Sequence, residues 1–289
     1  MPTHLPERED SYALLDSGEG MRLERFGAFV LARPDPEALW KKSLAEAEWK
    51  KADATYRRSG ATGDWSKASG FPRAWNAKYD GLNFVLRPTS FKHVGLFPEQ
   101  KVHWQWLAQK IAAHAGEPIK VLNIFAYTGG ATLSAARAGA QVTHVDSSKV
   151  AIEWARANAE ASDLSALPIR WIEDDALQFL RREVKRGNKY DVVIMDPPAF
   201  GHGSKGAIWK IERDFYELMD LVGQVLSENP LAVILNGYTA GYSPLTLHNN
   251  LLPFAERFGG TVESGELGIR EESGGRVLPA GVFARYARK

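Results

Sequence analysis

A carboxylate, two prolines and an aromatic ring follow one of the apolar runs of this sequence. The run Val192–Met195 leads directly into residues 196–200, which read Asp-Pro-Pro-Ala-Phe. The Asp196 side chain and the Pro197 carbonyl can accept hydrogen bonds from an amino group, and the fixed φ of proline keeps these acceptors rigid. Phe200 can stack on a planar ring. The segment therefore predicts a site for a flat, nitrogen-bearing group; a strand-ending turn with a buried Phe is the alternative.

Polar residues, aromatic residues and glycines end the other apolar runs in the second part of the chain. They are Asn123, Phe125, Tyr127, Thr128, Gly129 and Gly130 after the first run, Asp146 after the second, Asp174 and Asp175 after the third, and Asn236, Gly237 and Tyr238 after the fifth. From about residue 102 these runs alternate with helical patterns, which predicts a parallel sheet with helices on both faces. Ligands bind at the carboxyl ends of such strands, so we expect these residues to share one site.

The elements that must position this site predict an α/β fold with a doubly wound, mostly parallel sheet of seven strands. The last two apolar segments, residues 261–271 and 276–288, are joined by a short turn, so one of them must run antiparallel. We place this domain at residues 89–289. Residues 1–88 are predicted to form a small β-rich domain with one helix and a possible role in substrate binding.

Local signals within residues 1–88 support that division. A glycine-containing turn at residues 16–20 and the pair Asp80-Gly81 each separate alternating segments and predict hairpins. A helix is predicted to begin near Asp35, with Pro36 in its first turn.

The residue types at the strand ends are typical of a site for an adenosine-containing cofactor. Gly129 and Gly130 allow close approach of the backbone to a ligand. Asp146 can accept hydrogen bonds from both hydroxyls of a ribose, and Asp175 can accept one from an exocyclic amine. For each acid, a helix N-cap is the alternative role.

The identity of that cofactor follows from what the sequence lacks. Neither the GxGxxG fingerprint nor a P-loop is present, so pyrophosphate binding is poorly supported. An adenosine without phosphate, held by acidic residues that also suit a cationic sulfonium, fits S-adenosylmethionine. The seven histidines are scattered without metal-ligand spacing, and no metal is expected.

Four segments resemble motifs I to IV of class I S-adenosylmethionine-dependent methyltransferases, whose fold is Rossmann-like: VLNIFAYTGG, VTHVDSS, WIEDDA and DVVIMDPPAF. The Phe-x-Tyr-Thr-Gly variant of motif I resembles the large-subunit (23S) ribosomal RNA methyltransferases, and residues 91–100 resemble the segment that helps to enclose the cofactor there. Together the resemblance covers roughly residues 80–289.

This resemblance implies a role for each matching residue. Phe97 and Gln100 would line the cofactor pocket; Asn123, Phe125, Tyr127, Thr128 and Gly129 would hold the methionine portion; Asp146 and Ser147 the ribose; and Asp175 with Asp174 the adenine. Asp196, Pro197 and Phe200 would act on the target.

The absence of cysteine narrows the reaction. Methylation at pyrimidine C5 needs a covalent nucleophile, usually a cysteine thiolate, and is therefore excluded. Methylation at nitrogen needs only a lone pair aimed at the methyl group, so we expect N-methylation of a ribosomal RNA base, with relevance to rRNA processing. The alternative is a methyltransferase for a small molecule or a protein side chain.

Charge and composition bear on partners and location. Between Lys41 and Lys92 the sequence has eleven Lys/Arg and five acidic residues, interleaved with aromatics, which suits RNA binding; a solvated basic surface over an aromatic core is the alternative. The 289 residues contain no apolar run near 18 residues and no secretory signal at the start, so no membrane association and a cytoplasmic location are expected. The oligomeric state stays unknown.

Overall fold

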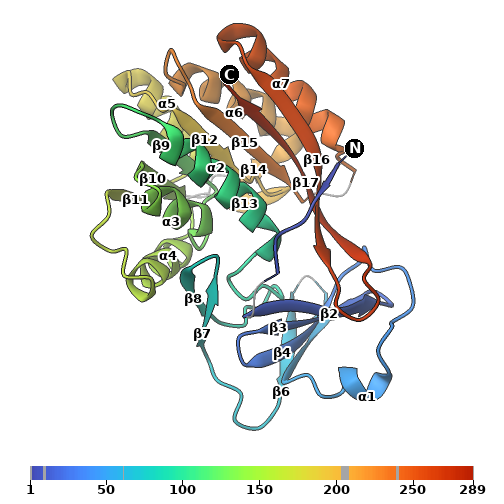
Figure 1. The fold of residues 1–289 in the computed structure, drawn as a ribbon. Coiled ribbons are helices and arrows are strands. Elements are labelled where there is room, and N and C mark those ends of the chain that lie inside the picture. Colours follow the sequence, from blue (N-terminus) through green and yellow to red (C-terminus); the bar gives the residue numbers. More distant parts are fainter. Residues whose placement is uncertain (1, 9–10, 61, 203–207, 239–240, 289) are drawn as a thin grey trace. The chain divides into compact units, whose positions relative to one another are not determined.

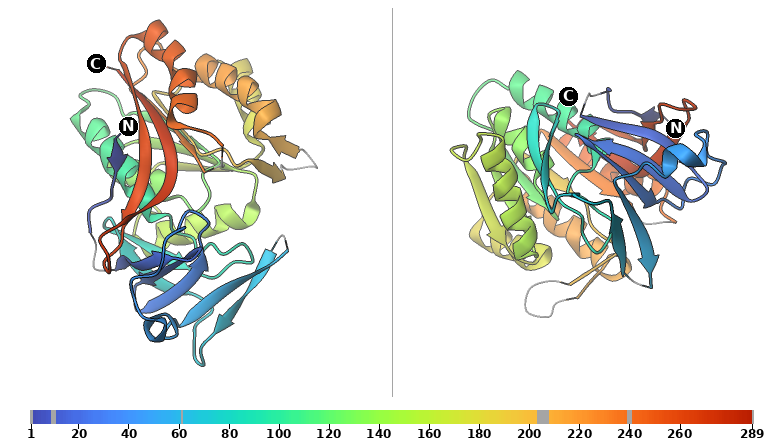
Figure 2. Two further views of the ribbon diagram at one scale, coloured as in Figure 1. Left: turned by 90° about the vertical axis from the view of Figure 1, so that its right-hand side faces the viewer. Right: turned by 90° about the horizontal axis from the view of Figure 1, so that it is seen from below.

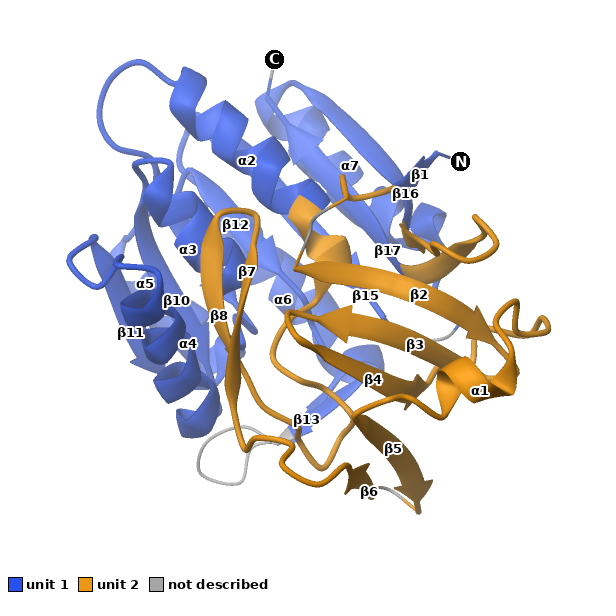
Figure 3. Cartoon of the chain, turned by 60° about the horizontal axis from the view of Figure 1, so that its bottom comes forward, with its two compact units in different colours: residues 1–4, 102–267, 281–289 blue, residues 5–101, 268–280 orange. Residues whose placement is uncertain are grey.

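The computed structural model of this chain describes residues 2–8, 11–60, 62–202, 208–238 and 241–288. They form two compact units (Figure 3). The larger unit contains Met1–His4, Val102–Leu267 and Gly281–Lys289, and the smaller one contains Leu5–Lys101 and Gly268–Ala280. The division into domains 1–88 and 89–289 stays a prediction, and the compact units interleave along the chain.

A mostly parallel sheet forms the centre of the larger unit (Figure 1). Its strands lie in the order β1 (Thr3–His4), β16 (Thr261–Arg270), β17 (Val277–Ala287), β15 (Ala232–Gly237), β12 (Val192–Met195), β9 (Lys120–Ile124), β10 (Gln141–Asp146) and β11 (Ile169–Glu173). The predicted fold class is confirmed, and β17 is the strand that runs antiparallel to β15. The sheet has eight strands rather than seven, because Thr3 and His4 add a short parallel strand beside β16.

Among the residues that the structure describes, six helices cover the two faces of this sheet (Figures 1 and 2). They are α2 (Lys101–Ala113), α3 (Gly130–Arg137), α4 (Lys149–Ala161), α5 (Ala176–Arg186), α6 (Ile211–Val225) and α7 (Pro244–Phe258). Alternate strand residues face opposite layers: Leu122 and Ile124 pack in the core with α5, α6 and α7, whereas Val121 packs with α2 and α3. The apolar runs are buried on both sides, as a doubly wound sheet requires.

The smaller unit is built mostly of antiparallel strands and hairpins. Its strands are β2 (Tyr12–Gly18), β3 (Met21–Phe26), β4 (Phe29–Pro34), β5 (Ala54–Ser59), β6 (Thr62–Lys67), β7 (Trp75–Tyr79) and β8 (Leu82–Leu86). The pair formed by β4 and β5 is parallel. Both predicted hairpins are present, and Asp80 and Gly81 have φ of 49° and 72°, as a two-residue type I′ turn requires.

The helix predicted to begin near Asp35 is wrong. Only α1 (Glu46–Trp49) forms in that segment. The buried Asp16 carboxylate accepts the backbone N–H groups of Ser43 and Leu44 and the indole N–H of Trp49. These bonds hold the chain in an irregular path, because a satisfied buried carboxylate outweighs the helix propensity of a few exposed residues.

Most aromatic residues of the basic segment are buried in the smaller unit. Those with at most 9% of their surface exposed are Trp49, Tyr56, Trp75, Tyr79 and Phe84. They form a core and are not available to stack bases, so the aromatic-core alternative holds for them. The basic side chains of the segment are mostly exposed.

Candidate functional site

The chain turns sharply between β9 and α3. Phe125, Tyr127 and Gly129 have φ of 57°, 48° and 84°, so every second residue of the turn is left-handed. Two of these three residues carry side chains that disfavour this conformation, which makes the turn a strained segment that its surroundings must hold. Asn158 of α4 contributes by donating its amide to the Thr128 carbonyl at 2.9 Å.

Asp146, at the carboxyl end of β10, also holds this turn. Its Oδ2 accepts the backbone N–H of Tyr127 at 2.8 Å, and its Oδ1 accepts that of Ser148 at 2.9 Å. Burial raises the pKa of Asp146, and the two N–H donors lower it in part. Each carboxylate oxygen has accepting capacity beyond its one backbone bond, as bidentate binding of two ribose hydroxyls requires.

A buried polar chain lies beneath the turn. The Asn123 amide donates to Thr132 Oγ1 at 3.0 Å, and that hydroxyl lies 2.9 Å from His144 Nδ1. Burial lowers the pKa of His144 to about 3, so its ring is neutral. Asn123 is 4% exposed, and its amide nitrogen is used inside the protein. The Asn123 amide thus supports Thr132, and a contact of Asn123 with the methionine portion of the cofactor stays a prediction.

Packing requires a glycine at position 130 and leaves little room for a side chain at position 129. A Cβ on Gly130 would lie 2.3 Å from Cζ2 of Trp104 in α2, and one on Gly129 would lie 3.1 Å from the Cβ of Ala155. At Gly130 an aromatic ring of the protein itself makes this close approach. Approach of a ligand to the backbone of these two glycines stays a prediction.

The acids after β11 have different local roles. Asp174 accepts the backbone N–H of Asp175 and forms an ion pair with Arg182. Asp175 is the N-cap of α5, because its Oδ1 accepts the N–H of Gln178 at 3.0 Å. Asp175 therefore has the alternative role considered for these acids, that of a helix N-cap. The N–H of Asp174 bonds to the Asp146 carbonyl at 3.0 Å, which keeps these two strand ends level.

Residues 196–200 follow β12 and enter a second hairpin. Phe200 begins β13 (Phe200–His202), which pairs antiparallel with β14 (Ile208–Lys210). Pro197 is buried, whereas Phe200 is 49% exposed. The buried-Phe alternative is therefore wrong, and the aromatic ring is presented at the surface. Residues 203–207, which include most of the glycine-rich loop, lie outside the described residues.

Trp209 is a residue that the sequence reasoning missed. It is 4% exposed, its Nε1 donates to the Pro198 carbonyl at 2.6 Å, and its ring centroid lies 5.1 Å from that of Phe125. One indole thus contacts both the turn after β9 and the segment after β12. A tryptophan inside a short hairpin has no periodic signal, so only the three-dimensional structure reveals it.

The strand ends thus bring together the predicted residues of the larger unit: the turn after β9, Asp146 with Ser147, Asp174 with Asp175, and residues 196–200. Phe97 and Gln100 belong to the smaller unit, where they flank and end the short 3₁₀-helix Pro98–Gln100. Their place in the cofactor pocket stays a prediction.

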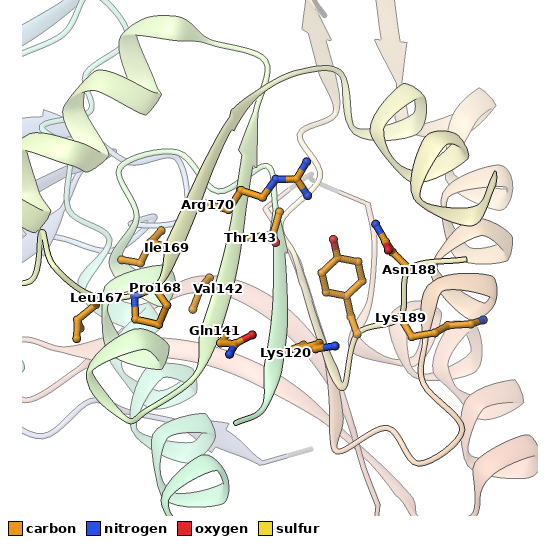
Figure 4. Close-up of a pocket in the computed structure, with 11 residues that line it drawn as sticks. Lys120, Gln141, Val142, Thr143, Leu167, Pro168, Ile169, Arg170, Asn188 and Lys189 are labelled. Carbon is orange, nitrogen blue, oxygen red and sulfur yellow. The ribbon is translucent and has the colours of Figure 1, made fainter. Parts of the chain in front are cut away.

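A cavity of about 500 Å³ lies at the opposite edge of the same sheet (Figure 4). Lys120, Val142, Ile169 and Tyr190, from the amino ends of neighbouring strands, contribute to its lining. None of its lining residues is a predicted site residue. The strand-end site and this cavity are therefore separate features of the larger unit.

The hydrogen-bonding groups at the carboxyl ends of these strands fit an adenosine-containing cofactor that carries a positive charge. They offer a carboxylate for vicinal hydroxyls at Asp146 and an acidic rim at Asp174 and Asp175. The neighbouring segment 196–200 contributes the Asp196 carboxylate, the Pro197 carbonyl and the exposed Phe200 ring, which suit a planar nitrogen-containing acceptor.

Comparison with known proteins identifies the family. Residues 44–239 match the family model described as S-adenosylmethionine-dependent methyltransferase. Curated relatives include the ribosomal RNA large subunit methyltransferase K/L of Shewanella sp. (strain MR-4), 31% identical over 159 residues, which are 54% of this chain and 22% of that protein. The same enzyme of Pseudoalteromonas atlantica is 33% identical over 142 residues, 48% of this chain and 19% of that protein. This chain thus spans about a fifth of the length of these curated relatives.

Solved structures agree with that result. A methyltransferase from Agrobacterium tumefaciens, described as S-adenosylmethionine-dependent, is 38% identical, with a TM-score of 0.96 over 100% of this chain and 94% of that one. A putative methyltransferase from Streptococcus mutans shares the fold at 18% identity, with a TM-score of 0.73 over 96% of this chain and 75% of that one. Among the described residues, no helix is long and apolar enough to cross a membrane. The chain belongs to the S-adenosylmethionine-dependent methyltransferase family, and S-adenosylmethionine is its methyl donor.

Proposed function

We propose that this protein transfers a methyl group to a nitrogen atom of a base in ribosomal RNA. The observation that carries this proposal is the segment after β12, where Phe200, whose ring is 49% exposed, follows Asp196 and the rigid Pro197 in the chain. A base extruded from its RNA strand can stack on such a ring and donate its amino group to such acceptors. S-adenosylmethionine, when bound, supplies the electrophilic methyl group.

The site residues have roles to match. Asp146 with Ser147 is proposed to hold the ribose of the cofactor, Asp175 with Asp174 its adenine, and Tyr127, Thr128 and Gly129 its methionine portion. Asp196 and Pro197 orient the target nitrogen, and much of the rate enhancement comes from this alignment. The absence of cysteine from the sequence supports nitrogen over pyrimidine C5 as the acceptor.

Two further observations support RNA as the substrate. The names of the curated relatives refer to the large-subunit ribosomal RNA. The smaller unit also exposes several basic side chains: Lys50, Lys51, Arg57, Arg58, Lys67, Arg73 and Lys78. Exposed Lys and Arg bind phosphates with an affinity that falls steeply with salt concentration. A ribosomal RNA substrate would place the enzyme in the cytoplasm.

The test is methylation of RNA from cells that lack the gene. Purified protein and labelled S-adenosylmethionine should label this ribosomal RNA, while RNA from wild-type cells, already modified, should accept little label. Asp196→Ala should lower kcat by about 100-fold or more, because the side-chain acceptor that orients the target is lost. Asp191→Ala is a matched control at the other end of β12, where the carboxylate accepts the N–H of Lys120 at 2.9 Å. Labelling of only a small metabolite or a protein would contradict the RNA substrate and favour the alternative acceptor.

A further inference from the structure

A second exposed aromatic ring lies at the same edge of the sheet as Phe200. Strands β12 and β15 are parallel neighbours, with Met195 paired to Leu235, so Asp196 leaves the sheet level with Asn236, one residue before β15 ends at Gly237. Tyr238 follows two residues after Asn236 and is 41% exposed, whereas all six residues of β15 are buried. The chain thus changes from complete burial to a large exposed ring beside residues 196–200.

The backbone at Gly281, which carries no side chain, supports the Tyr238 ring from one side. A Cβ on Gly281 of β17 would lie 3.0 Å from Cε1 and 3.2 Å from Cδ1 of Tyr238. Gly281 also has φ of 133°, a conformation that residues with a side chain rarely adopt. A glycine at this position therefore lets the ring rest against the sheet while its remaining surface is presented to solvent. A ring fixed in this way loses little side-chain entropy when it binds a ligand.

Phe200 is fixed by a different element. Its backbone pairs with Lys210 in the β13–β14 hairpin, and the hairpin is held to Pro198 by the indole of Trp209. The Ile211 N–H also bonds to the Ala199 carbonyl at 3.1 Å. Two exposed aromatic rings therefore follow neighbouring strands of the sheet: Phe200 follows β12 and the acceptors Asp196 and Pro197, and Tyr238 follows β15.

We propose that Tyr238 contacts the target directly and, together with Phe200, holds the planar ring whose nitrogen is methylated. This inference rests on the proposed function. It adds a residue that contacts the substrate and the requirement that the acceptor group be planar. The chemical class of the acceptor is a flat heteroaromatic ring. Base–aromatic stacking contributes strongly to affinity and tolerates different bases, because every base has a π-face. An aliphatic amide or amine has no π-face that could stack between two such rings.

The experiment compares Tyr238→Ala and Tyr238→Phe with the wild-type enzyme on a ribosomal RNA fragment that contains the target. We expect Tyr238→Ala to raise the KM for RNA by about 10-fold to 100-fold, as loss of a stacking ring does, and Tyr238→Phe to stay within about threefold of wild type. The Kd for S-adenosylhomocysteine, measured by calorimetry, should stay unchanged in both. Tyr216→Ala on α6 is the matched control, because that tyrosine is 88% exposed and the truncation is the same.

A double-mutant cycle tests whether the two rings hold the same group. Tyr238→Ala combined with Phe200→Ala should raise KM by less than the product of the single effects, because the second truncation removes a ring from a target that is already poorly held. Multiplicative effects would mean that the rings contact separate parts of the RNA and would overturn the shared-ring inference. A Tyr238→Ala enzyme with the wild-type KM would overturn the contact itself.

These outcomes are distinguishable from failure of the proposed function. If wild-type protein labels no RNA but labels a heteroaromatic metabolite, the rRNA proposal fails, and the same variants assayed on that metabolite decide the ring inference. If it labels only an aliphatic amine or a side-chain amide, both proposals fail.

Discussion

The indole Nε1 of Trp209 donates a hydrogen bond of 2.6 Å to the carbonyl of Pro198. The same ring lies against Phe125, whose φ of 57° belongs to the strained turn after β9. One buried side chain thus connects the turn assigned to the methyl donor with the segment assigned to its acceptor. In-line methyl transfer depends on the relative placement of these two groups, and small misplacements are costly in rate.

Replacing Trp209 with Phe should therefore slow the reaction without weakening cofactor binding. The variant keeps an aromatic ring against Phe125 but removes the hydrogen-bond donor to the Pro198 carbonyl. The segment that contains Pro198 is then no longer held in place. We expect kcat to fall about tenfold, which corresponds to the net value of one buried hydrogen bond, with the Kd for S-adenosylhomocysteine within about threefold of wild type. Steady-state kinetics and calorimetry measure the two effects.

A control for this variant is Tyr286→Phe. It removes another buried donor in the larger unit, the Tyr286 hydroxyl that bonds to the Gly259 carbonyl at 2.8 Å. Both variants should lose a similar amount of thermal stability, but only Trp209→Phe should lose kcat. Equal kinetics for the two would show that Trp209 supports the fold alone.

Asp146 makes a prediction about cofactor affinity and its pH dependence. Replacing its carboxylate with the amide of Asn sets an NH₂ group against the N–H of Tyr127 or Ser148 and removes the charged acceptor proposed for the ribose. We expect S-adenosylhomocysteine to bind about 100-fold more weakly, because two charge-assisted hydrogen bonds are lost.

The pH dependence of the wild-type protein checks the same assignment. Because burial raises the pKa of Asp146, its carboxylate should take up a proton at a higher pH than an exposed Asp does. The protonated form loses acceptor capacity, so affinity should decrease as the pH falls through this raised pKa. A Kd that stays constant from neutral pH down to pH 4 would argue against a ribose contact by Asp146.

Local sequence signals were sufficient for much of this architecture. Alternation of apolar and polar residues around Asp80-Gly81 predicted a hairpin that the structure confirms, because a two-residue turn depends on its own sequence. Alternating strands and helices predicted the sheet, and its strand ends predicted where Asp146 and Asp196 would lie. Each of these features depends on residues that are close together in the chain.

Features that depend on distant partners could not be predicted in this way. The helix expected near Asp35 was lost to hydrogen bonds from Ser43 and Leu44 to Asp16, almost 30 residues earlier. The amide of Asn123 is used by Thr132, which a reading of strand ends cannot show. In each case a buried polar group determined the local structure. Such a group must form a hydrogen bond, and its partner can come from a distant part of the sequence.

Gly130 provides a prediction about packing. Its replacement by Ala places a Cβ 2.3 Å from Cζ2 of Trp104, a rigid ring in the core, so α2 and α3 must move apart. We expect the free energy of unfolding to fall by about 1–3 kcal/mol, as for other overpacked cores. Chemical denaturation measures this change.

Two further variants make that test specific. Gly223→Ala in α6 sets a Cβ 3.2 Å from Cε1 of Phe254, a contact that a small shift relieves, and it gains helix propensity. It should therefore be nearly neutral. Adding Trp104→Leu to Gly130→Ala removes the obstructing ring and should recover part of the lost stability relative to Trp104→Leu alone. No recovery would mean that the cost of Gly130→Ala does not arise from the contact with Trp104.

His144 makes a prediction about stability in mild acid. Burial lowers its pKa to about 3 from an ordinary value of 6.5, so the folded protein keeps the ring neutral where the unfolded chain protonates it. As the pH falls below 6.5, the unfolded state gains a proton that the folded state does not, and the free energy of unfolding decreases. At pH 5 this loss is about 2 kcal/mol from His144 alone.

Urea unfolding at pH 7 and at pH 5 measures this effect. In His144→Phe, which keeps a ring beside Trp171 but cannot take up a proton, the decrease between the two pH values should be smaller than in wild type by about 2 kcal/mol. The variant also loses the contact with Thr132, so its stability at pH 7 should be lower; only the difference between the two pH values tests the assignment. His114→Phe, at an exposed position, should keep the wild-type difference. An unchanged difference in His144→Phe would mean that other groups cause the acid sensitivity, with the buried His103, whose pKa burial also lowers to about 3, as the next residue to replace.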